Sequence, residues 1–522
     1  MTPSPLIVKN DIEDQFRNTK SIFFMGEWNT PEYYRYLCEI AWIANSVSSE
    51  IHIVRYDIPR NREIQKFQEI FLQKLTKILP TINLTDIPPG FFSGNKPNEN
   101  MEIDTLEKAF QHNASLGHSI VSTLMSSLIS VPKLKDKSLG KVISQYSREF
   151  IHSEAVCDFM ISELKPDFVI ITNGRFPDQA GLRAMAEKNG TPYLIFERGT
   201  RGNGRFHLQP HQTQDYNSVR SYYQDYFNSI GVDSTISVDK SKHFLDLQEK
   251  DSRFNPFAKR WSQRNNSSGN QEKTPFCVFF TSSTDERYSN LGIDMNGWNS
   301  QEEAIIQTYS ALRRLGFDFL VRIHPNAGWK TWGELRRMIS ALRKKKIAFV
   351  LPWEVPGTYE LLQQVSLVAT WGSTVCIEAT ARGIPTINLG RTPYDNVIDV
   401  LVISPDNIKT IDFNKVPKPD DLKSIRFFNE RLQYGFQVEH IDSDGRFNEI
   451  KELFAAGEFP EKSKISFRNG LKSVRKYFIQ PQYAFLLLNK LLGYKFSVFL
   501  MRNFILLISK IRIQFAVEDR SI

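Results

Sequence analysis

The fold is decided by the stretch Thr370-Trp371-Gly372-Ser373-Thr374-Val375-Cys376-Ile377-Glu378-Ala379, which closes with Gly383-Ile384-Pro385. One apolar run, 367–369, precedes the stretch, and a second, 385–389, follows it. The order apolar run, glycine turn, helical stretch, apolar run predicts a strand, a tight turn, a helix and another strand. We therefore expect one unit of a parallel sheet here.

The glycine turn of this unit has the features of an anion site. Gly372 allows a close backbone turn, and Ser373 or Thr374 is expected to cap a helix whose free N–H groups point at the turn. Glu378 lies four residues after Thr374, whereas a capping box needs three. We expect the turn to bind a phosphate and Glu378 to hydrogen-bond ribose hydroxyls.

Length and composition indicate a multidomain globular protein. A chain of 522 residues is too long for one compact core, and contents of 41% hydrophobic and 24% charged residues are ordinary. The four cysteines form no C-x-x-C pair, which favours a reducing compartment. The first residues contain no basic and apolar leader, so we expect a cytoplasmic location.

The positive charge of the chain is concentrated at its end. Residues 461–522 contain 12 Lys or Arg and 3 Asp or Glu, and the remainder is close to neutral. This tail is rich in Phe, Leu and Ile, but its charge-free stretches are shorter than the roughly 18 residues of a membrane span. It predicts an interfacial helix on the anionic inner face of the cytoplasmic membrane. The alternative is a helical pair packed on the N-terminal domain; nucleic-acid binding is disfavoured because no recognisable module accompanies the charge.

Strand and helix patterns alternate in two series. Short apolar runs predict strands at 21–26, 51–56, 168–172, 193–196, 276–280, 319–323, 347–351, 367–369 and 385–389. Helical spacing predicts helices at 31–45, 179–188, 301–315, 332–343 and 359–364, and a mostly helical stretch from about 103 to 163.

The two series predict an α/β protein of two Rossmann-like domains facing a cleft, with ligands beyond the carboxyl ends of the strands. The expected division is an N-terminal Rossmann-like domain, a polar linker, a C-terminal nucleotide-binding domain, a helical return segment and the basic amphipathic tail, at 1–254, 255–275, 276–410, 411–460 and 461–522.

Two candidate site residues, a histidine and an arginine, lie at the end of a predicted strand in the second half. His324, followed by Pro325, can donate to a phosphate or act as an acid toward a leaving phosphate. The plainer alternative is a histidine packed at a strand end. Arg322 is expected on the face opposite Ile323, as a nucleotide contact or only a surface charge.

In the first half, Glu197 follows a predicted strand and opens the loop 197–205, which has three glycines and three arginines. Such a cationic loop suits an anionic ligand. Glu197 can be a general base, or it can simply pair with one of these arginines.

Two weaker signals complete the candidates. Ser282 belongs to a Ser/Thr/Asp run after a strand, where it can contact phosphate or sugar or merely form a turn. His207 and His211 are separated by Pro210, which makes helical metal-ligand spacing doubtful, so we assign no metal and no cofactor.

Three motifs together resemble those of bacterial capsule-polysaccharide glycosyltransferases of GT-B architecture, including polysialyltransferases and capsule Kdo transferases. They are Glu197-Arg198-Gly199, His324-Pro325, and Ser373-Thr374 with Glu378. The resemblance covers roughly residues 165–395, and the motifs follow in the family's order.

The resemblance implies a role for each motif. Glu197 would deprotonate the acceptor hydroxyl, and His324, Ser373 and Thr374 would contact the nucleotide phosphate. The sequence departs from the polysialyltransferase pattern where Arg198 replaces a second acidic residue and Thr374 replaces a second serine.

The resemblance thus favours a metal-independent glycosyltransferase that uses a nucleotide-sugar donor and an oligosaccharide or lipid-linked acceptor. Its expected site residues are Glu197 and His324 as catalytic groups, with Arg322, Gly372, Ser373, Thr374, Glu378 and Ser282 as nucleotide-sugar contacts. A CDP-alcohol glycerophosphotransferase and a non-catalytic nucleotide-binding scaffold of a polysaccharide assembly complex are the alternatives.

Overall fold

The computed structural model describes residues 13–14, 16–26, 31–56, 62–88, 91, 103–127, 134–135, 139–199, 204–212, 215–230, 275–282, 295–325, 327, 332–352, 354, 356–433 and 435–455. The described residues form two compact units. The first takes its described residues from within 1–123, 132–218 and 433–455, and the second takes them from 219–432 and from the end of a helix at 124–127. The boundaries expected from the sequence stay predictions; the expected tail and all but the last position of the expected linker lie outside the described residues.

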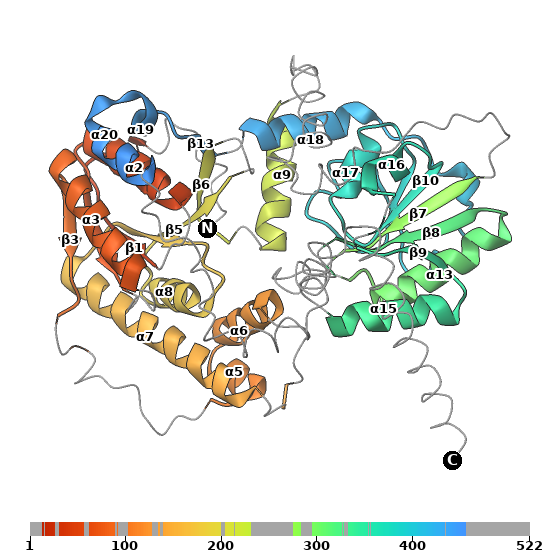
Figure 1. Cartoon of the computed structure of the whole chain (residues 1–522), viewed down its shortest axis with the longest axis horizontal. Helices are drawn as coiled ribbons and strands as arrows, with labels where there is room; N and C mark the ends of the chain where they lie inside the picture. Colours follow the sequence, from red (N-terminus) through yellow and green to blue (C-terminus); the bar gives the residue numbers. More distant parts are fainter. Residues whose placement is uncertain are drawn as a thin grey trace, which may run out of the picture. The chain divides into compact units, whose positions relative to one another are not determined.

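The first unit is built on a seven-stranded sheet in the order β13-β6-β5-β4-β1-β2-β3 (Figure 1). Five neighbouring strands run parallel: β1 (Lys20–Met25), β2 (Glu50–Arg55), β3 (Ile82–Thr85), β4 (Phe168–Thr172) and β5 (Tyr193–Arg198). β6 (Arg205–Gln209) is antiparallel to β5, and β13 (Phe436–Gln437) is antiparallel to β6. Chain order across β1 to β6 is therefore 3-2-1-4-5-6, the order of the doubly wound dinucleotide-binding fold.

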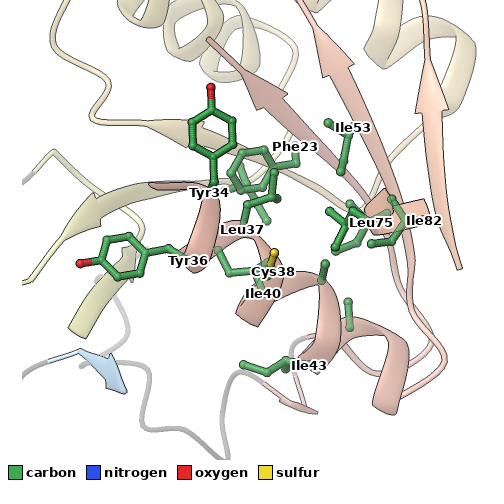
Figure 2. Packing of buried hydrophobic residues seen from close by; sticks show 14 of the residues in the cluster. Phe23, Tyr34, Tyr36, Leu37, Cys38, Ile40, Ile43, Ile53, Leu75 and Ile82 are labelled. Carbon is green, nitrogen blue, oxygen red and sulfur yellow. The ribbon is translucent and has the colours of Figure 1, made fainter. Parts of the chain in front are cut away.

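Helices bury both faces of this sheet, because successive strand residues point to opposite sides. Phe23 of β1 packs against α2 (Pro31–Ser46) and α3 (Arg62–Ile78), with Leu37 and Leu75 in the same core (Figure 2). Phe24 packs on the other face against α7 (Gly140–Leu164) and α8 (Pro177–Lys188). Two further helices, α5 (Leu106–His112) and α6 (Ala114–Ser127), precede α7.

The chain returns to the first unit near its described end. β13, α19 (His440–Ser443) and α20 (Asn448–Ala455) follow one another, and α19 and α20 pack on α2 and α3. Glu39 of α2 is fully buried and accepts bonds from the backbone N–H of His440 at 3.0 Å and from its Nδ1 at 2.7 Å. A buried carboxylate is tolerated when it is hydrogen-bonded in this way, so Glu39 fixes the returning segment.

The second unit has a six-stranded, wholly parallel sheet in the order β12-β11-β10-β7-β8-β9. The strands are β7 (Phe276–Phe280), β8 (Asp318–Arg322), β9 (Ala348–Val350), β10 (Leu367–Thr370), β11 (Thr386–Asn388) and β12 (Leu401–Val402). In chain order this is again 3-2-1-4-5-6. The mixed α/β class and the parallel sheets expected from the sequence are confirmed, and each expected strand lies within about two residues of the observed one.

The second sheet is also covered on both faces. Phe279 packs toward α13 (Gln301–Arg314) and α15 (Trp332–Lys344), and Phe280 packs toward α16 (Thr358–Leu362) and α17 (Val375–Thr380). The helices α9 (Tyr216–Ile230) and α18 (Asp421–Gln433) meet through Tyr223 and Phe427, whose ring centroids are 4.9 Å apart.

Two further observations concern the whole described chain. All four cysteines are buried as free thiols. Within the described ranges, no helix combines the length and apolar character that crossing a membrane requires.

Candidate functional site

The second sheet has its topological switch point between β7 and β10, where the strand order reverses. Ligands of doubly wound sheets bind beyond the carboxyl ends of the strands at such a point. Thr281 and Ser282 follow β7 here, and Trp371 and Gly372 follow β10. The turn at Trp371 and Gly372 therefore supplies one side of the position where a ligand is expected.

The turn after β10 is held by Asn388 at the end of β11. Gly372 has φ +65°, a conformation that favours glycine. Its N–H donates to Asn388 Oδ1 at 2.9 Å, and Thr370 Oγ1 donates to the same oxygen at 2.9 Å. Asn388 is fully buried, so the turn is fixed by an interior amide that the sequence pattern did not single out.

The loops after β7, β8 and β10 are joined by hydrogen bonds. Ser282 Oγ donates to the carbonyl of Trp371 at 2.6 Å, and the Ser282 N–H donates to Gln301 Oε1 at 2.8 Å. The backbone N–H of His324 donates to Thr281 Oγ1 at 2.8 Å. Ser282, His324 and Gly372 therefore lie in three neighbouring loops at the carboxyl edge of one sheet.

The helix after the turn is short. α17 has six residues, its N-cap Thr374 makes no side-chain capping bond, and the Ser373 hydroxyl accepts from the Val375 N–H at 3.4 Å. Of the two residues expected to cap the helix, Thr374 is thus the wrong one, because it already has helical φ and ψ of −58° and −16°, and it is Ser373 whose hydroxyl accepts an N–H of the helix. In the part of the chain that the structure describes, the N–H groups of Ser373 and Thr374 donate to no protein acceptor. These two donors, rather than the dipole of a long helix, are what the turn offers to an anion.

Glu378 and Arg322 differ in their surroundings. Glu378 is half-buried on α17, and its backbone N–H bonds to the carbonyl of Thr374 at 3.4 Å. Arg322 is 1% exposed, and its guanidinium donates to the carbonyls of Leu351 and of Pro352, the second at 3.3 Å. The alternative that Arg322 is a surface charge is therefore wrong: this side chain fixes the connection after β9.

In the first unit, the carboxylate of Glu197 receives three donors. Tyr33 Oη donates to Oε1 at 2.8 Å, the Arg198 N–H donates to the same oxygen at 2.8 Å, and Asn173 Nδ2 donates to Oε2. These donors come from α2, from β5 itself and from the turn after β4, where Asn173 has φ +57°. Asparagine tolerates this left-handed conformation better than most residues.

Glu197 lies inside a strand rather than after it. β5 runs to Arg198 and pairs with β6, with Glu197 opposite His207, so the expected loop begins as a β-hairpin. The sequence missed this because the glycine and arginine content resembles a loop, whereas pairing depends on the distant strand. In the described part of this hairpin, what Glu197 accepts is a backbone N–H and not an arginine side chain.

Tyr33 remains a hydrogen-bond donor over the ordinary pH range. Its burial, and then the adjacent charge of Glu197, raise the pKa of the Tyr33 hydroxyl well above its usual value. Among the described residues, Oε1 of Glu197 has two partners and Oε2 has one. Oε2 is therefore the oxygen with an open position for another proton.

The structure thus groups Ser282, His324, Gly372, Ser373 and Thr374 at one edge of the second sheet and places Glu197 at the carboxyl edge of the first. Sequence reasoning missed Asn388, Tyr33 and Asn173. Only Asn173, in an Asn-Gly pair directly after a strand, carried a local signal.

Comparisons with known proteins give no family. No family model matches the chain, and no curated protein matches it either. Among solved structures, the beta Kdo 2,4 transferase KpsC of Thermosulfurimonas dismutans is similar at 15% identity and a TM-score of 0.32, over 51% of this chain and 78% of its own. The UDP-GlcNAc 2-epimerase of Neisseria meningitidis is similar at 12% identity and a TM-score of 0.29, over 84% of this chain and 100% of its own.

A glycosyltransferase of Rickettsia africae is similar at 12% identity and a TM-score of 0.25, over 85% of this chain and 100% of its own. Likenesses with TM-scores this low carry no argument about function. The fold is therefore assigned from the order of the strands, and the candidate site from its hydrogen bonds.

Proposed function

We propose that this chain is a glycosyltransferase that moves a sugar from a nucleotide-sugar donor to a growing bacterial capsule or surface polysaccharide. The observation that carries the proposal is the hydrogen-bonded edge at the switch point of the second sheet. There, the N–H groups of Ser373 and Thr374, which have no acceptor among the described residues, follow the fixed turn at Gly372, with His324 in a neighbouring loop. We infer that the ligand of this edge is a sugar nucleotide, because the three motifs resemble those of glycosyltransferases that use such donors.

Each site residue has a role in the proposal. Ser373, Thr374 and His324 stabilise the phosphate of the donor, and Glu378 hydrogen-bonds the ribose. Ser282 and Arg322 act indirectly, because their side chains bond to backbone carbonyls and hold the surrounding loops. Donors fixed before the reaction stabilise a leaving phosphate without reorganisation, so the proposal requires no metal.

The reaction is a transfer to an acceptor hydroxyl. The hydroxyl oxygen bonds to the anomeric carbon, the bond from that carbon to the phosphate oxygen breaks, and the electron pair leaves with the nucleotide. Oε2 of Glu197 takes the hydroxyl proton, since Oε1 already has two donors. We propose that the acceptor is an oligosaccharide or a lipid-linked sugar at the inner membrane face.

A nucleotide screen tests the donor site. CMP, UDP, GDP and CDP are added separately, and the thermal unfolding of the chain is measured. Ligand at 100 times its Kd stabilises the folded state by about 2.7 kcal/mol, so one nucleotide should raise the midpoint clearly above the others.

The matched variants separate the site from general effects. Ser373→Ala with Thr374→Ala should weaken binding of that nucleotide by roughly tenfold or more, because hydrogen bonds to a charged group contribute about 1.5–3 kcal/mol. Ser310→Ala with Thr410→Ala is the control, since both hydroxyls are exposed and bond within their own turns. Intact affinity in the first pair of substitutions would exclude the two hydroxyls as phosphate contacts, because alanine leaves the backbone N–H groups of Ser373 and Thr374 in place.

A further inference from the structure

The amino edge of the second sheet carries a cluster of exposed cations, here called the cationic edge: Arg313, Arg314, Lys344, Lys345 and Lys346. The arginines end α13 directly before β8, and the lysines end or follow α15 directly before β9. β8 and β9 are neighbours in the sheet, and α13 packs beside α15 (Figure 1). The two groups of cations therefore lie close to one another on one surface.

No member of the cationic edge forms an ion pair with any residue in the described ranges. Elsewhere on this protein, exposed cations do pair, as Arg17 does with Asp14 and Lys423 with Asp399. Cations in the last turn of a helix complement its dipole, which accounts for part of the cluster. The helix dipole does not account for Lys345 and Lys346, which follow the end of α15.

Lys346 occupies a position that glycine would fill at lower cost. Its φ is +55°, a left-handed conformation that is unfavourable for a residue with a Cβ. After α13, the chain has Gly316 with φ +80° in the corresponding position. Glycine at position 346 would therefore remove the charge while suiting the backbone.

The cationic edge is separate from the proposed nucleotide site. β8 has five residues at about 3.3 Å each, so its two ends are on the order of 15 Å apart. His324 follows the carboxyl end of this strand, and the cations lie at the amino end. Their side chains are exposed rather than gathered around a buried polar group, which suits an extended anionic surface better than one small anion.

We propose that the cationic edge binds the headgroups of an anionic phospholipid membrane. Lysine is a compact point charge on a flexible stem and suits a diffuse layer of headgroups. Leu315 directly follows the two arginines in the α13–β8 turn and is 39% exposed, which gives the surface an apolar side chain that can enter the interface. No aromatic residue for stacking on nucleic-acid bases stands among the five cations.

Vesicle binding of the full chain tests this proposal. The variant Lys344→Gln, Lys345→Gln, Lys346→Gly removes three charges, and glycine suits the backbone at position 346. Partitioning onto vesicles of phosphatidylglycerol and phosphatidylcholine should fall roughly a hundredfold at low salt, since each cation contributes about fivefold. Wild-type binding should also weaken as salt is raised, and it should be weak on phosphatidylcholine alone.

The control is Lys409→Gln, Lys415→Gln, Lys418→Gln, which removes three exposed charges that follow β12 at the other end of the same sheet. It should bind vesicles as the wild type does, and thermal unfolding should show both variants folded. Equal losses in the two variants, or no loss in either, would overturn the proposal. A loss of binding to soluble heparin with unchanged vesicle binding would overturn it too, and would assign the surface to a soluble polyanion.

Discussion

Three donors from separate parts of the first unit hold the carboxylate of Glu197, and this arrangement limits what the residue can do. Tyr33 and the Arg198 N–H occupy Oε1, and Asn173 occupies one position of Oε2. A carboxylate fixed in this way presents one oxygen in one direction. The proposed role of Glu197 as a base therefore depends on Tyr33 as a positioning residue.

Replacing Tyr33 with phenylalanine should expose this dependence. Tyr33→Phe removes one donor to a charged group, and kcat for sugar transfer should fall roughly tenfold or more, with the KM for the donor unchanged. Tyr36→Phe is the matched control. Tyr36 lies one turn further on α2 and also packs on Phe196, at 6.1 Å between ring centroids, against 5.7 Å for Tyr33. Equal kcat values in the two variants would show that Tyr33 does not position Glu197.

At the scale of elements, α7 and α8 approach each other closely because of one glycine. A Cβ on Gly181 of α8 would lie 2.3 Å from the carbonyl oxygen of Phe150 on α7, so only glycine permits this packing. Close packing also removes water from Glu154 of α7. Its burial raises the pKa of Glu154 to about 7, although Lys188 acts in the opposite direction.

This raised pKa predicts the sign of a pH effect on stability. In the unfolded chain, Glu154 loses its proton near its ordinary value of 4.5; in the folded chain it keeps the proton until about pH 7. The folded state therefore binds more protons in this window, and stability falls as pH rises from about 4.5 to 7.

Replacing Glu154 with glutamine should remove this loss. Glu154→Gln should raise the unfolding midpoint relative to wild type at pH 8 and change it little at pH 4.5. Thermal melts at the two pH values measure the difference. Glu163→Gln, an exposed position on the same helix, should give no such pH-dependent gain; a gain equal at both pH values for Glu154→Gln would contradict the burial effect.

Across the whole molecule, the sequence predicted the strands better than their arrangement. Short apolar runs such as 168–172 and 276–280 match β4 and β7 residue for residue, because a strand buried on both faces is apolar throughout. The order 3-2-1-4-5-6 in each sheet depends on pairing between distant segments, which local patterns do not record. β13 illustrates this: two residues of the returning segment join a sheet whose other strands lie more than 200 positions earlier.

The glycine turn of the candidate site could be predicted from the sequence, but the residues that hold the site in place could not. Gly372-Ser373-Thr374 is recognisable because a turn between strand and helix has a sequence signature. Asn388 and Tyr33 act through side-chain bonds to the ends of other elements, and nothing in their local sequence marks those partners. Arg322 is a further example. Strand alternation allowed this residue to be a surface charge, but the structure shows that its side chain is buried.

In the proposed reaction, Glu197 removes the proton from an acceptor hydroxyl during transfer from a nucleotide sugar. The most direct measurement is transfer of a labelled sugar, from the donor whose nucleotide stabilises the chain, to a polysaccharide acceptor. Glu197→Gln should lower kcat by roughly 10² to 10⁴ with nucleotide affinity unchanged, whereas Glu452→Gln, an exposed position of the same unit, should transfer as the wild type does. Transfer by Glu197→Gln at the wild-type rate, or a wild type that transfers no sugar from any nucleotide donor, would contradict the account.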